Sequence, residues 1–349
     1  MVKPVFKQIL RWSSQKVTGL RKANSGDWAW LDVKPMPLPV LNRKLWKVAE
    51  PSIPYYVLLS LSVVIATLGL LANSAATIIG AMIVAPLMGP ILGMAFSMIM
   101  SNRRLLRRST LALVTGALMS IAIGAMICQL VGIETLTPEI TARTSPNLLD
   151  LGVALAAGGA GAFAFSRRDI ADALPGVAIA VALVPPLSVI GIGIALNLQD
   201  VTFGSSLLFL TNLTGIIFSG GLVLLLQRYG SLARAQKGLT VAIVALLILG
   251  IPLALSFQDV VIREQTRSQI NQLIRQETLT FSDKDIRSLT VQRHQGQLLV
   301  DLEVSAPAGE ISDRQVDLVR EFLQNQTERA IALNVTVIPT EQFISPVEE

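Results

Sequence analysis

Seven apolar stretches, none of which contains Lys or Arg, fill most of residues 55–257. Each is about 20 residues long, the length that an α-helix needs to cross the hydrocarbon core of a bilayer. Charged residues make up only 15% of the chain, against about 25% in soluble domains. The pattern predicts an all-α polytopic membrane domain and excludes an ordinary soluble enzyme. The stretches are residues 55–72, 75–100, 110–132, 148–165, 175–198, 203–226 and 239–257.

Basic residues alternate between the connections that join these stretches. Four connections carry 19 Lys and Arg residues in total, and the other three carry a single one, Arg143. Because cytoplasmic connections are enriched in Lys and Arg, we expect seven crossings of the cell (inner) membrane, with the N-terminus cytoplasmic and the C-terminus extracytoplasmic. A re-entrant second stretch would break this alternation. The basic connections are residues 1–54, 101–109, 166–174 and 227–238, and the others are residues 72–74, 133–147 and 198–202.

The basic N-terminal segment, residues 1–54, contains a region typical of an amphipathic helix. Pro4–Lys22 has apolar residues on one helical stripe and Lys and Arg off it, as in helices that lie on an anionic leaflet. A partly disordered positive tail is the alternative. The segment has no short apolar core followed by a small-residue cleavage site, so we expect no cleavable signal. The net charge of +5 is explained by membrane topology, and we expect no nucleic-acid partner.

The last segment, residues 258–349, is predicted to be a small extracytoplasmic α+β domain of order α-β-β-α-β. A helix over residues 259–277 precedes a hairpin of strands Leu289–His294 and Gln297–Ser305. Ser312 to Gln315 resembles a capping box that opens a second helix, and Ile331–Ile338 forms the third strand. The segment has a net charge of −6, from nine basic and 15 acidic residues, which is compatible with export. We expect it to serve oligomerisation or partner binding.

Two of the apolar stretches contain paired prolines: Pro86 and Pro90 in the second, and Pro185 and Pro186 in the fifth. Proline removes a backbone donor and clashes with the preceding helical turn, so each pair is expected to unwind a few residues near the middle of the bilayer. A shift of 100 residues superposes six identical residue types and indicates a duplication. The first copy contributes Ile79, Val84, Pro86, Leu87, Gly93 and Ala95.

This duplication predicts a 3+3 inverted repeat with one extra helix. The repeat units are residues 55–132 and 148–226, and the extra span is 239–257. An odd number of crossings in each unit inverts the second copy, as in many secondary transporters whose sites lie between paired discontinuous helices. The alternative is that the prolines only kink two helices so that they pack in a bundle.

Few polar groups lie deep in the apolar stretches, and the candidate substrate-binding residues are taken from these and from Asn73 and Arg143 in the connections. Thr and Asn at depth either coordinate a solute or join helices by hydrogen bonds. Arg143 either attracts an anion or caps Glu139 or a helix end. No Asp, Glu, Lys, Arg or His lies in the middle of a stretch, which argues against proton coupling. The candidates are Asn73, Thr77, Arg143, Ser188, Thr211 and Asn212, with Pro86, Pro90, Pro185 and Pro186 shaping the backbone.

Several chemistries are excluded by composition. The single cysteine, Cys128, and the single histidine, His294, leave no cysteine- or histidine-ligated metal site and no internal disulfide. No catalytic motif is present, so we expect no enzyme activity, no cofactor and no metal. The glycine-rich run that starts at Gly158 has neither a preceding strand nor a following Lys-Ser/Thr, so it indicates close helix packing rather than a nucleotide loop.

Four segments resemble a known family. They are Asn73–Ile91, with Ile-Gly-Ala-Met-Ile-Val-Ala-Pro-Leu-Met-Gly-Pro inside it, Gly176–Leu187 and Leu208–Leu213, together with Ala142–Pro146. On these segments, residues 55–230 are identified as similar to the bacterial and archaeal domain-of-unknown-function family numbered 389. The resemblance implies a polytopic hydrophobic membrane domain and marks Arg143 as part of the pattern. It implies no activity.

Together these observations favour a transporter or channel-like protein that passes a small solute or ion between the inverted units. The alternative is a membrane scaffold or sensor that presents the C-terminal α+β domain for oligomerisation or partner binding. The expected partners are the lipid bilayer, a small solute or ion, and further copies of the chain in a homo-oligomer.

Overall fold

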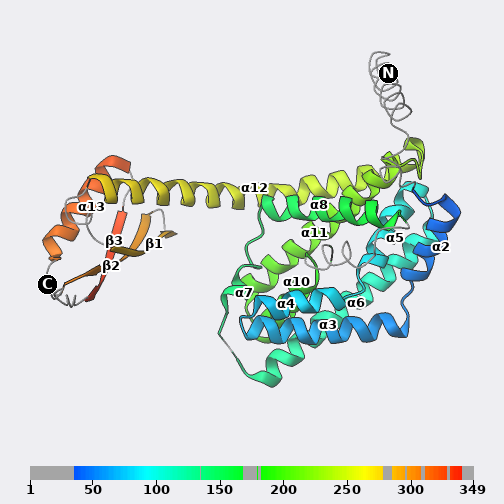
Figure 1. The fold of residues 1–349 in the computed structure, drawn as a ribbon, viewed down its shortest axis with the longest axis horizontal. Helices are drawn as coiled ribbons and strands as arrows, with labels where there is room; N and C mark the ends of the chain where they lie inside the picture. The colour runs from blue at the N-terminus through cyan, green and yellow to red at the C-terminus, as the bar shows by residue number, and fades with distance from the viewer. Residues whose placement is uncertain are drawn as a thin grey trace, which may run out of the picture. The chain divides into compact units, whose positions relative to one another are not determined.

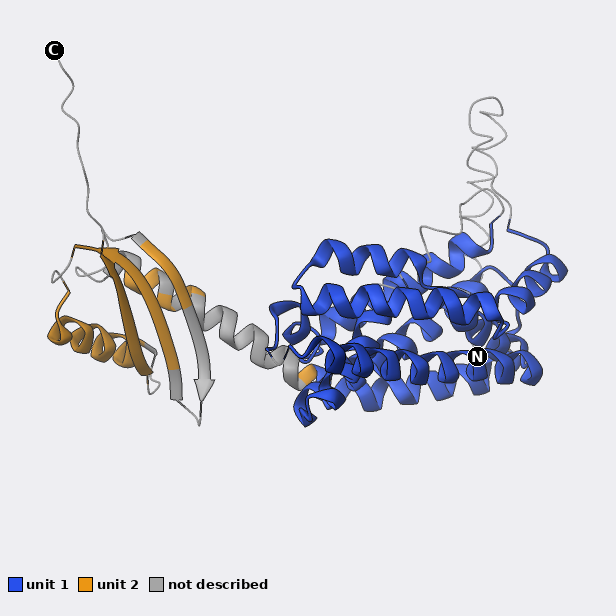
Figure 2. Ribbon diagram, turned by 90° about the horizontal axis from the view of Figure 1, so that it is seen from below, with its two compact units in different colours: residues 1–253 blue, residues 254–349 orange. Residues whose placement is uncertain are grey.

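The computed structural model describes residues 35–133, 135–167, 179, 182–277, 285–294, 297–307, 311–327 and 331–339. The chain divides into two compact units, Met1–Leu253 and Ala254–Glu349, drawn in two colours in Figure 2. The amphipathic region expected over Pro4–Lys22 lies outside the described residues. Each unit is described by itself.

The first unit is built of helices (Figure 1). Five of them are long and apolar enough to cross a membrane: α3, α6, α8, α11 and the Ala233–Ala254 part of α12. The consecutive helices α4 and α5 pass the same test together but are bent by 58° at their junction. The helices are α2 Leu38–Val48, α3 Ile53–Leu71, α4 Ala75–Val84, α5 Met88–Met100, α6 Arg103–Val131, α7 Pro138–Thr141, α8 Leu148–Phe165, α10 Val184–Ala195, α11 Gln199–Leu226 and α12 Leu232–Glu277.

The expected seven-helix inverted repeat is not confirmed. The described part of the fifth apolar stretch contains α10, which has only 12 residues, too few to cross a bilayer alone. The number of spans in the described residues is therefore five, or up to six when the bent α4–α5 pair is taken as one. The seventh stretch and the helix expected over residues 259–277 are one continuous helix, α12.

The long helices begin at short polar side chains in the connections. Ser52 and Ser74 accept hydrogen bonds from the amides of Tyr55 and Thr77, which lie in the first turns of α3 and α4. Asn147 forms a complete capping box with Asp150 at the start of α8. Side-chain oxygens at these positions satisfy backbone donors that have no partner within the helix. Polar residues between the apolar stretches therefore fix where α3, α4 and α8 start.

The basic connections meet at one end of the helical bundle. The Met36 amide donates to the Ser166 carbonyl (2.8 Å), and the Ser101 hydroxyl donates to the Arg234 carbonyl (3.0 Å). Arg108 at the start of α6 forms an ion pair with Glu50, which directly precedes α3. These contacts join all four basic connections, so this end is called the basic end.

The connections that are poor in Lys and Arg meet at the opposite end. The Thr137 hydroxyl donates to the Leu70 carbonyl (2.7 Å), and the Ser205 hydroxyl donates to the Arg143 carbonyl (3.1 Å). The bent pair α4–α5 starts next to Leu70 and finishes at Ser101. It therefore connects the two ends of the bundle, as expected for a crossing rather than a re-entrant loop.

Tyr229 joins three segments at the basic end. Its hydroxyl donates to the Met36 carbonyl (2.7 Å) and lies 3.5 Å from the Ser166 carbonyl. Burial raises the pKa of the Tyr229 phenol, and the positive charge of Arg167 partly opposes this shift. The phenol is therefore held neutral as a donor.

Replacing Tyr229 with Phe is expected to lower the free energy of unfolding by about 1 kcal/mol at pH 7, the usual net value of one hydrogen bond. The folded-state pKa of Tyr229 is raised. The contribution of its phenol to the free energy of unfolding is therefore fully present below the unfolded pKa of about 10, and it is lost as the pH rises through the folded pKa. Unfolding of both proteins in detergent at pH 7 and above pH 10 measures it. Equal stabilities at pH 7 would contradict the role.

Close packing in the bundle depends on glycines. A methyl group on Gly158 of α8 would overlap the Ile216 carbonyl and the Ser219 hydroxyl of α11. A methyl group on Gly191 of α10 would lie 2.7 Å from the Ala125 amide nitrogen of α6. In both cases the added carbon would lie under 3.0 Å from an atom of the neighbouring helix, which is closer than real side-chain carbons come without a shift. The run that starts at Gly158 therefore serves helix packing, as its sequence context predicted.

The second unit has the predicted order α-β-β-α-β. After the last part of α12 come β1 Asp285–His294, β2 Gln297–Ala306, α13 Asp313–Thr327 and β3 Ile331–Pro339. Strand β2 pairs antiparallel with β1 and parallel with β3, so α13 is the crossover helix. The core contains Val300, Leu302 and Val304, which alternate along β2, packed with Ile270, Ile274 and Leu323 of the helices. The Gln315 Oε1 atom accepts hydrogen bonds from the Ser312 amide (2.8 Å) and hydroxyl (3.0 Å), which closes the start of α13.

Candidate functional site at two helix breaks

The first break separates α4 from α5. Ala85 has an extended backbone (φ −67°, ψ 122°) and Pro86 follows it, so α4 ends at Val84. Pro90 does not take part in the break, because it lies in the first turn of α5. A proline there costs little, since the amides of a first helical turn have no partner within the helix. Of the first proline pair, only Pro86 lies in unwound backbone.

This break lies closer to the basic end than the sequence predicted. The Ser62 hydroxyl, near the middle of α3, donates to the Ala81 carbonyl of α4 (2.7 Å). The break itself faces Leu58, which follows the start of α3 at Ile53 by about 8 Å at 1.5 Å per residue. The short turn between α3 and α4 fixes this antiparallel register. The break at Pro86 therefore lies level with the second turn of α3 rather than with its middle.

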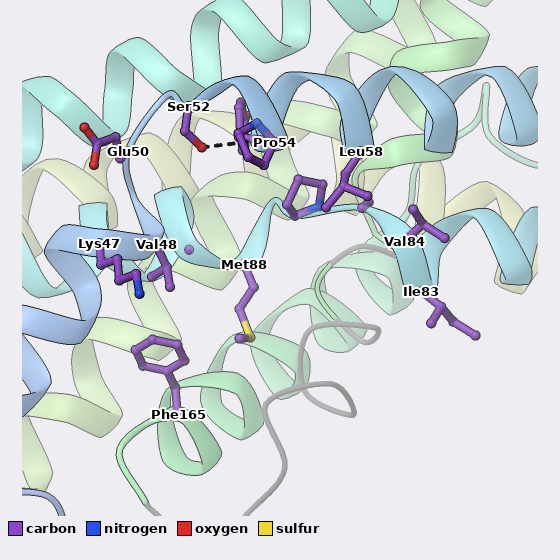
Figure 3. Close-up of a pocket in the computed structure, with 14 residues that line it drawn as sticks. Lys47, Val48, Glu50, Ser52, Pro54, Leu58, Ile83, Val84, Met88 and Phe165 are labelled. Atoms are coloured by element: carbon purple, nitrogen blue, oxygen red, sulfur yellow. Dashed lines mark hydrogen bonds between the residues drawn. The ribbon is translucent and has the colours of Figure 1, made fainter.

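A cavity of about 390 Å³ opens at the first break (Figure 3). Its polar lining comes from Lys47, Glu50 and Ser52, which lie in or just after α2. Glu50 is paired with Arg108, whose guanidinium lies 5.4 Å from the centre of the Trp46 ring. The apolar lining is Val48, Pro54, Tyr55, Leu58, Ile83, Val84, Ala85, Pro86, Met88, Gly89 and Phe165.

Two charged residues of this cavity were missed by sequence reasoning. Lys47 and Glu50 precede the first apolar stretch and read as part of a basic cytoplasmic segment. The structure folds α2 back onto the start of α5, where a methyl group on Gly89 would overlap the Val48 carbonyl. Gly89 lies three residues after Pro86. A glycine at this position was the signal in the sequence that a second backbone comes close to the break.

The second break is the start of α10. Pro185 and Pro186 lie in its first turn, directly after Val184. The first turn of a helix suits proline. The fixed φ of proline matches the helix, and the backbone amide that proline lacks would have no acceptor within the helix at this position. The Ala182 amide, just before α10, donates to the Ile179 carbonyl (3.3 Å). In the described residues, this proline pair begins a helix instead of unwinding one.

One polar side chain of α11 contacts the backbone just before α10. The Asn212 amide nitrogen of α11 donates to the Ala182 carbonyl (2.8 Å). The Asn212 Oδ1, Thr211 Oγ1 and Ser188 Oγ atoms are buried and have no hydrogen-bond partner among the described residues. Ser188 and Thr211 are fully buried, and Asn212 is 4% exposed. Buried side-chain polar atoms usually find a partner, so three such oxygens on α10 and α11 call for an explanation.

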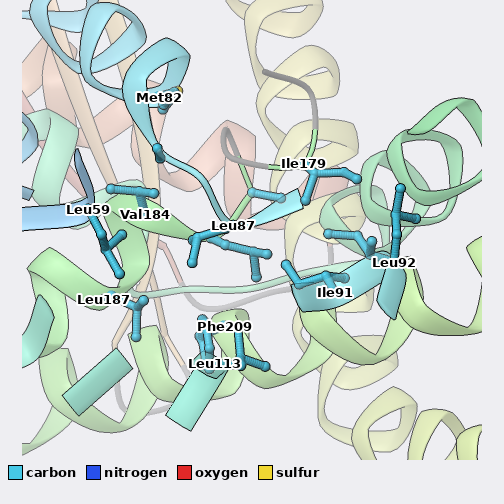
Figure 4. Close-up of a cluster of buried hydrophobic side chains, with 14 of the residues drawn as sticks. Leu59, Met82, Leu87, Ile91, Leu92, Leu113, Ile179, Val184, Leu187 and Phe209 are labelled. Carbon is cyan, nitrogen blue, oxygen red and sulfur yellow. The ribbon is translucent and has the colours of Figure 1, made fainter. Parts of the chain in front are cut away.

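Apolar side chains fill the space between the two breaks. Leu87 of the first break and Val184 and Leu187 of the second are almost completely buried and belong to one cluster. Figure 4 shows Leu87 between Val184 and Ile179. Leu87, Val184 and Leu187 therefore lie in packed hydrocarbon.

The other three candidate residues lie at the end of the bundle opposite the basic end. The Asn73 Oδ1 atom accepts a hydrogen bond from the Glu139 amide (3.3 Å), and Thr77 belongs to the exposed cap of α4. Arg143 pairs with the Glu139 carboxylate (2.8 Å) and also donates to the Glu139 carbonyl. The structure thus gathers Ser188, Thr211, Asn212, Pro185 and Pro186 on α10 and α11, and places Asn73, Thr77 and Arg143 elsewhere. The contacts of Arg143 are those of the capping interpretation.

These features define the class: a helical protein with several helices fit to cross a membrane, joined to a small α+β unit. Residues 82–218 match the family described as Domain of unknown function (DUF389), which confirms the expected resemblance over this segment. The chain is also similar to an uncharacterized protein of Methanocaldococcus jannaschii, with 28% identity over 201 residues. This match covers 56% of the chain and 62% of the length of that relative. The family segment starts in α4 and stops in α11, so it includes both breaks.

Proposed function

We propose that this chain is a multi-pass membrane protein that moves a small solute or ion past the start of α10. The observation that carries the proposal is the set of three buried oxygens without partners on α10 and α11. Leaving such a group unpaired costs about 1–3 kcal/mol. A passing cation, water molecule or small polar solute supplies the missing partner. All three oxygens are neutral, so they stabilise a hydrated or weakly charged species without the desolvation cost of a buried carboxylate.

The route starts at the cavity of the first break. This cavity opens at the basic end and carries polar side chains from α2. Between it and the buried oxygens lie Leu87, Val184 and Leu187. Apolar constrictions of this kind close pathways by excluding water. In the proposed cycle the described structure is the closed state, and a shift of α5 against α10 opens the path.

The proposal includes the orientation in the cell membrane. The meeting of all four basic connections at one end supports a cytoplasmic location for that end, because Lys and Arg are retained on the cytoplasmic side. With the N-terminal segment there, the seven crossings expected from the sequence make the second unit extracytoplasmic. Its net charge of −6 is in keeping with this side.

Replacing Thr211 with Val tests the transport proposal, because the Thr211 hydroxyl makes no hydrogen bond in the closed state. Removing an unpaired buried hydroxyl is expected to leave the free energy of unfolding unchanged or to raise it by about 1 kcal/mol. If the hydroxyl binds the solute on its way, flux falls about tenfold, which corresponds to ~1.4 kcal/mol. Flux is measured from liposomes with a panel of cations, anions and small neutral metabolites.

The matched control is Thr214→Val on the same helix, whose hydroxyl donates to the Leu210 carbonyl one turn earlier (2.7 Å). It is expected to leave flux unchanged. Zero flux for the whole panel from folded wild-type protein would overturn the proposal. A stability loss in Thr211→Val without a loss of flux would instead assign the hydroxyl to helix packing.

The second candidate function is a membrane scaffold or sensor that presents the α+β unit to a partner. The observation that favours it is the burial of Leu87, Val184 and Leu187 within one hydrophobic cluster. Under this view the breaks are rigid packing elements, and the second unit, with its own hydrophobic core, carries the activity. The two functions predict opposite effects of the same pair of variants, as argued in the Discussion.

A further inference from the structure

A groove of about 460 Å³ runs along the outside of α6 near the basic end. Its described lining residues follow a spacing of three and four and therefore form one stripe of the helix. Two arginines lie at its start, and apolar and Thr side chains follow. The lining residues are Arg103, Leu106, Arg107, Thr110, Leu111, Val114 and Thr115.

The two arginines of this groove have no acidic partner among the described residues. Arg103 and Arg107 are exposed, and neither forms an ion pair in the described part of the chain. Arg108, the next residue, differs, because it pairs with Glu50 and lies over the ring of Trp46. The described lining of the groove includes no acidic residue. The groove thus offers two positive charges to an anion from outside the chain.

The rest of the stripe is apolar and open. Leu111 and Val114 are each 50% exposed. From Arg103 to Val114 the helix rises about 16 Å, close to the ~15 Å that one leaflet contributes to the hydrocarbon core. The stripe therefore places paired guanidiniums at the level of lipid headgroups and an apolar surface at the depth of one acyl chain.

We propose that this groove binds one anionic phospholipid of the leaflet at the basic end. Arg103 and Arg107, one helical turn apart, hold the phosphate, because the planar guanidinium forms paired hydrogen bonds with phosphate oxygens. Leu106, Leu111 and Val114 contact an acyl chain. A free phosphate has no acyl chain that could contact the apolar stripe. A zwitterionic lipid has no net negative charge, so the two arginines attract it less. The inference is independent of the transport proposal.

Native mass spectrometry of the delipidated full-length protein tests this site. The protein is titrated with phosphatidylglycerol, with phosphatidylcholine of the same acyl chains, and with inorganic phosphate. We expect phosphatidylglycerol to bind at least tenfold more tightly than phosphatidylcholine, and millimolar phosphate to leave it bound. The double variant Arg103→Gln/Arg107→Gln is expected to lose about tenfold in affinity for phosphatidylglycerol, as charged hydrogen bonds are removed.

The matched control is Arg104→Gln, which removes the same charge from an exposed residue of the same turn outside the groove lining. It is expected to keep the wild-type affinity within twofold. Arg103→Lys/Arg107→Lys keeps the charge and the fold and is expected to give an intermediate loss. Equal binding of both lipids, an equal loss in Arg104→Gln, or unchanged affinity in both double variants would overturn the proposal. Displacement by phosphate would assign the arginines to free phosphate and overturn it as well.

Discussion

Replacing Gly158 with Val is expected to destabilise the bundle by more than 3 kcal/mol, at the upper end of the range for overpacked sites. The added Cβ would overlap the Ile216 carbonyl and the Ser219 hydroxyl of α11. A backbone carbonyl within a helix cannot move aside as a flexible side chain does, so α8 and α11 must separate along their contact. Thermal unfolding of the purified protein in detergent measures the loss as a drop in Tm.

Gly152→Val on the same helix is the control for this prediction. A methyl group on Gly152 meets nothing within 4 Å, and the residue is exposed. The substitution therefore changes helix propensity and apolar surface without changing packing, and its expected effect is below about 1 kcal/mol. Similar losses in the two variants would show that the close contact at Gly158 does not hold the helices together.

Gly158 also shows what the sequence revealed about packing. Its glycine-rich run lacks the strand and the Lys-Ser/Thr of a nucleotide loop, and that absence was enough to predict a helix contact. The partner on α11 was not predictable, because Ile216 and Ser219 lie more than 50 positions away along the chain. Local pattern identifies a residue that needs space, whereas its neighbour is set by the tertiary arrangement.

The two ends of the bundle were predictable from charge alone. The alternation of basic and neutral connections grouped Met36, Ser166 and Arg234 before any contact was known, and hydrogen bonds join their segments. The α+β order was equally accessible, because strand alternation and turn residues are local signals. Charge in a connection and periodicity in a strand are properties of one segment, so they can be recognised in the sequence whatever the arrangement of the helices.

The prolines illustrate the limit of this reasoning. The 100-residue shift aligns Pro86 with Pro186, yet Pro86 lies in unwound backbone and Pro186 in the first turn of α10. Proline is unfavourable inside a helix and favourable at its start, so the same residue type fits both places. The aligned prolines therefore do not occupy equivalent positions, and the inverted repeat stays a prediction.

The polar candidates were found because amides and hydroxyls are rare in apolar stretches. Asn212 was selected on that ground, and the structure places its side chain against the Ala182 carbonyl at the second break. Arg143 was selected as the single basic residue of the connections poor in Lys and Arg, and it lies against Glu139 at the far end. A polar side chain in an apolar stretch needs a hydrogen-bond partner, but the sequence does not say whether that partner is a neighbouring residue or a solute.

The double variant Pro185→Ala/Pro186→Ala and a truncation that removes residues 258–349 separate the two proposed functions. The two prolines remove two amide donors from the buried start of α10. Alanine restores both donors, which are then available to pair with the buried oxygens that have no partner in the described structure. If those oxygens serve a passing solute, the double variant is expected to lose at least tenfold in liposome flux, and the truncated protein is expected to keep most of it.

The scaffold function predicts the reverse order. The truncated protein then fails to rescue the phenotype of a strain that lacks the chain, whereas the proline variant rescues it fully, because alanine is a good helix former and α10 stays in place. Both readouts are taken on both variants, with circular dichroism in detergent to confirm that the helices remain. Loss of flux in the proline variant together with rescue by the truncated protein supports transport, because the buried oxygens of α10 and α11 are then needed and the α+β core is not. The opposite pair of results assigns the activity to the second unit and leaves Ser188, Thr211 and Asn212 as packing groups.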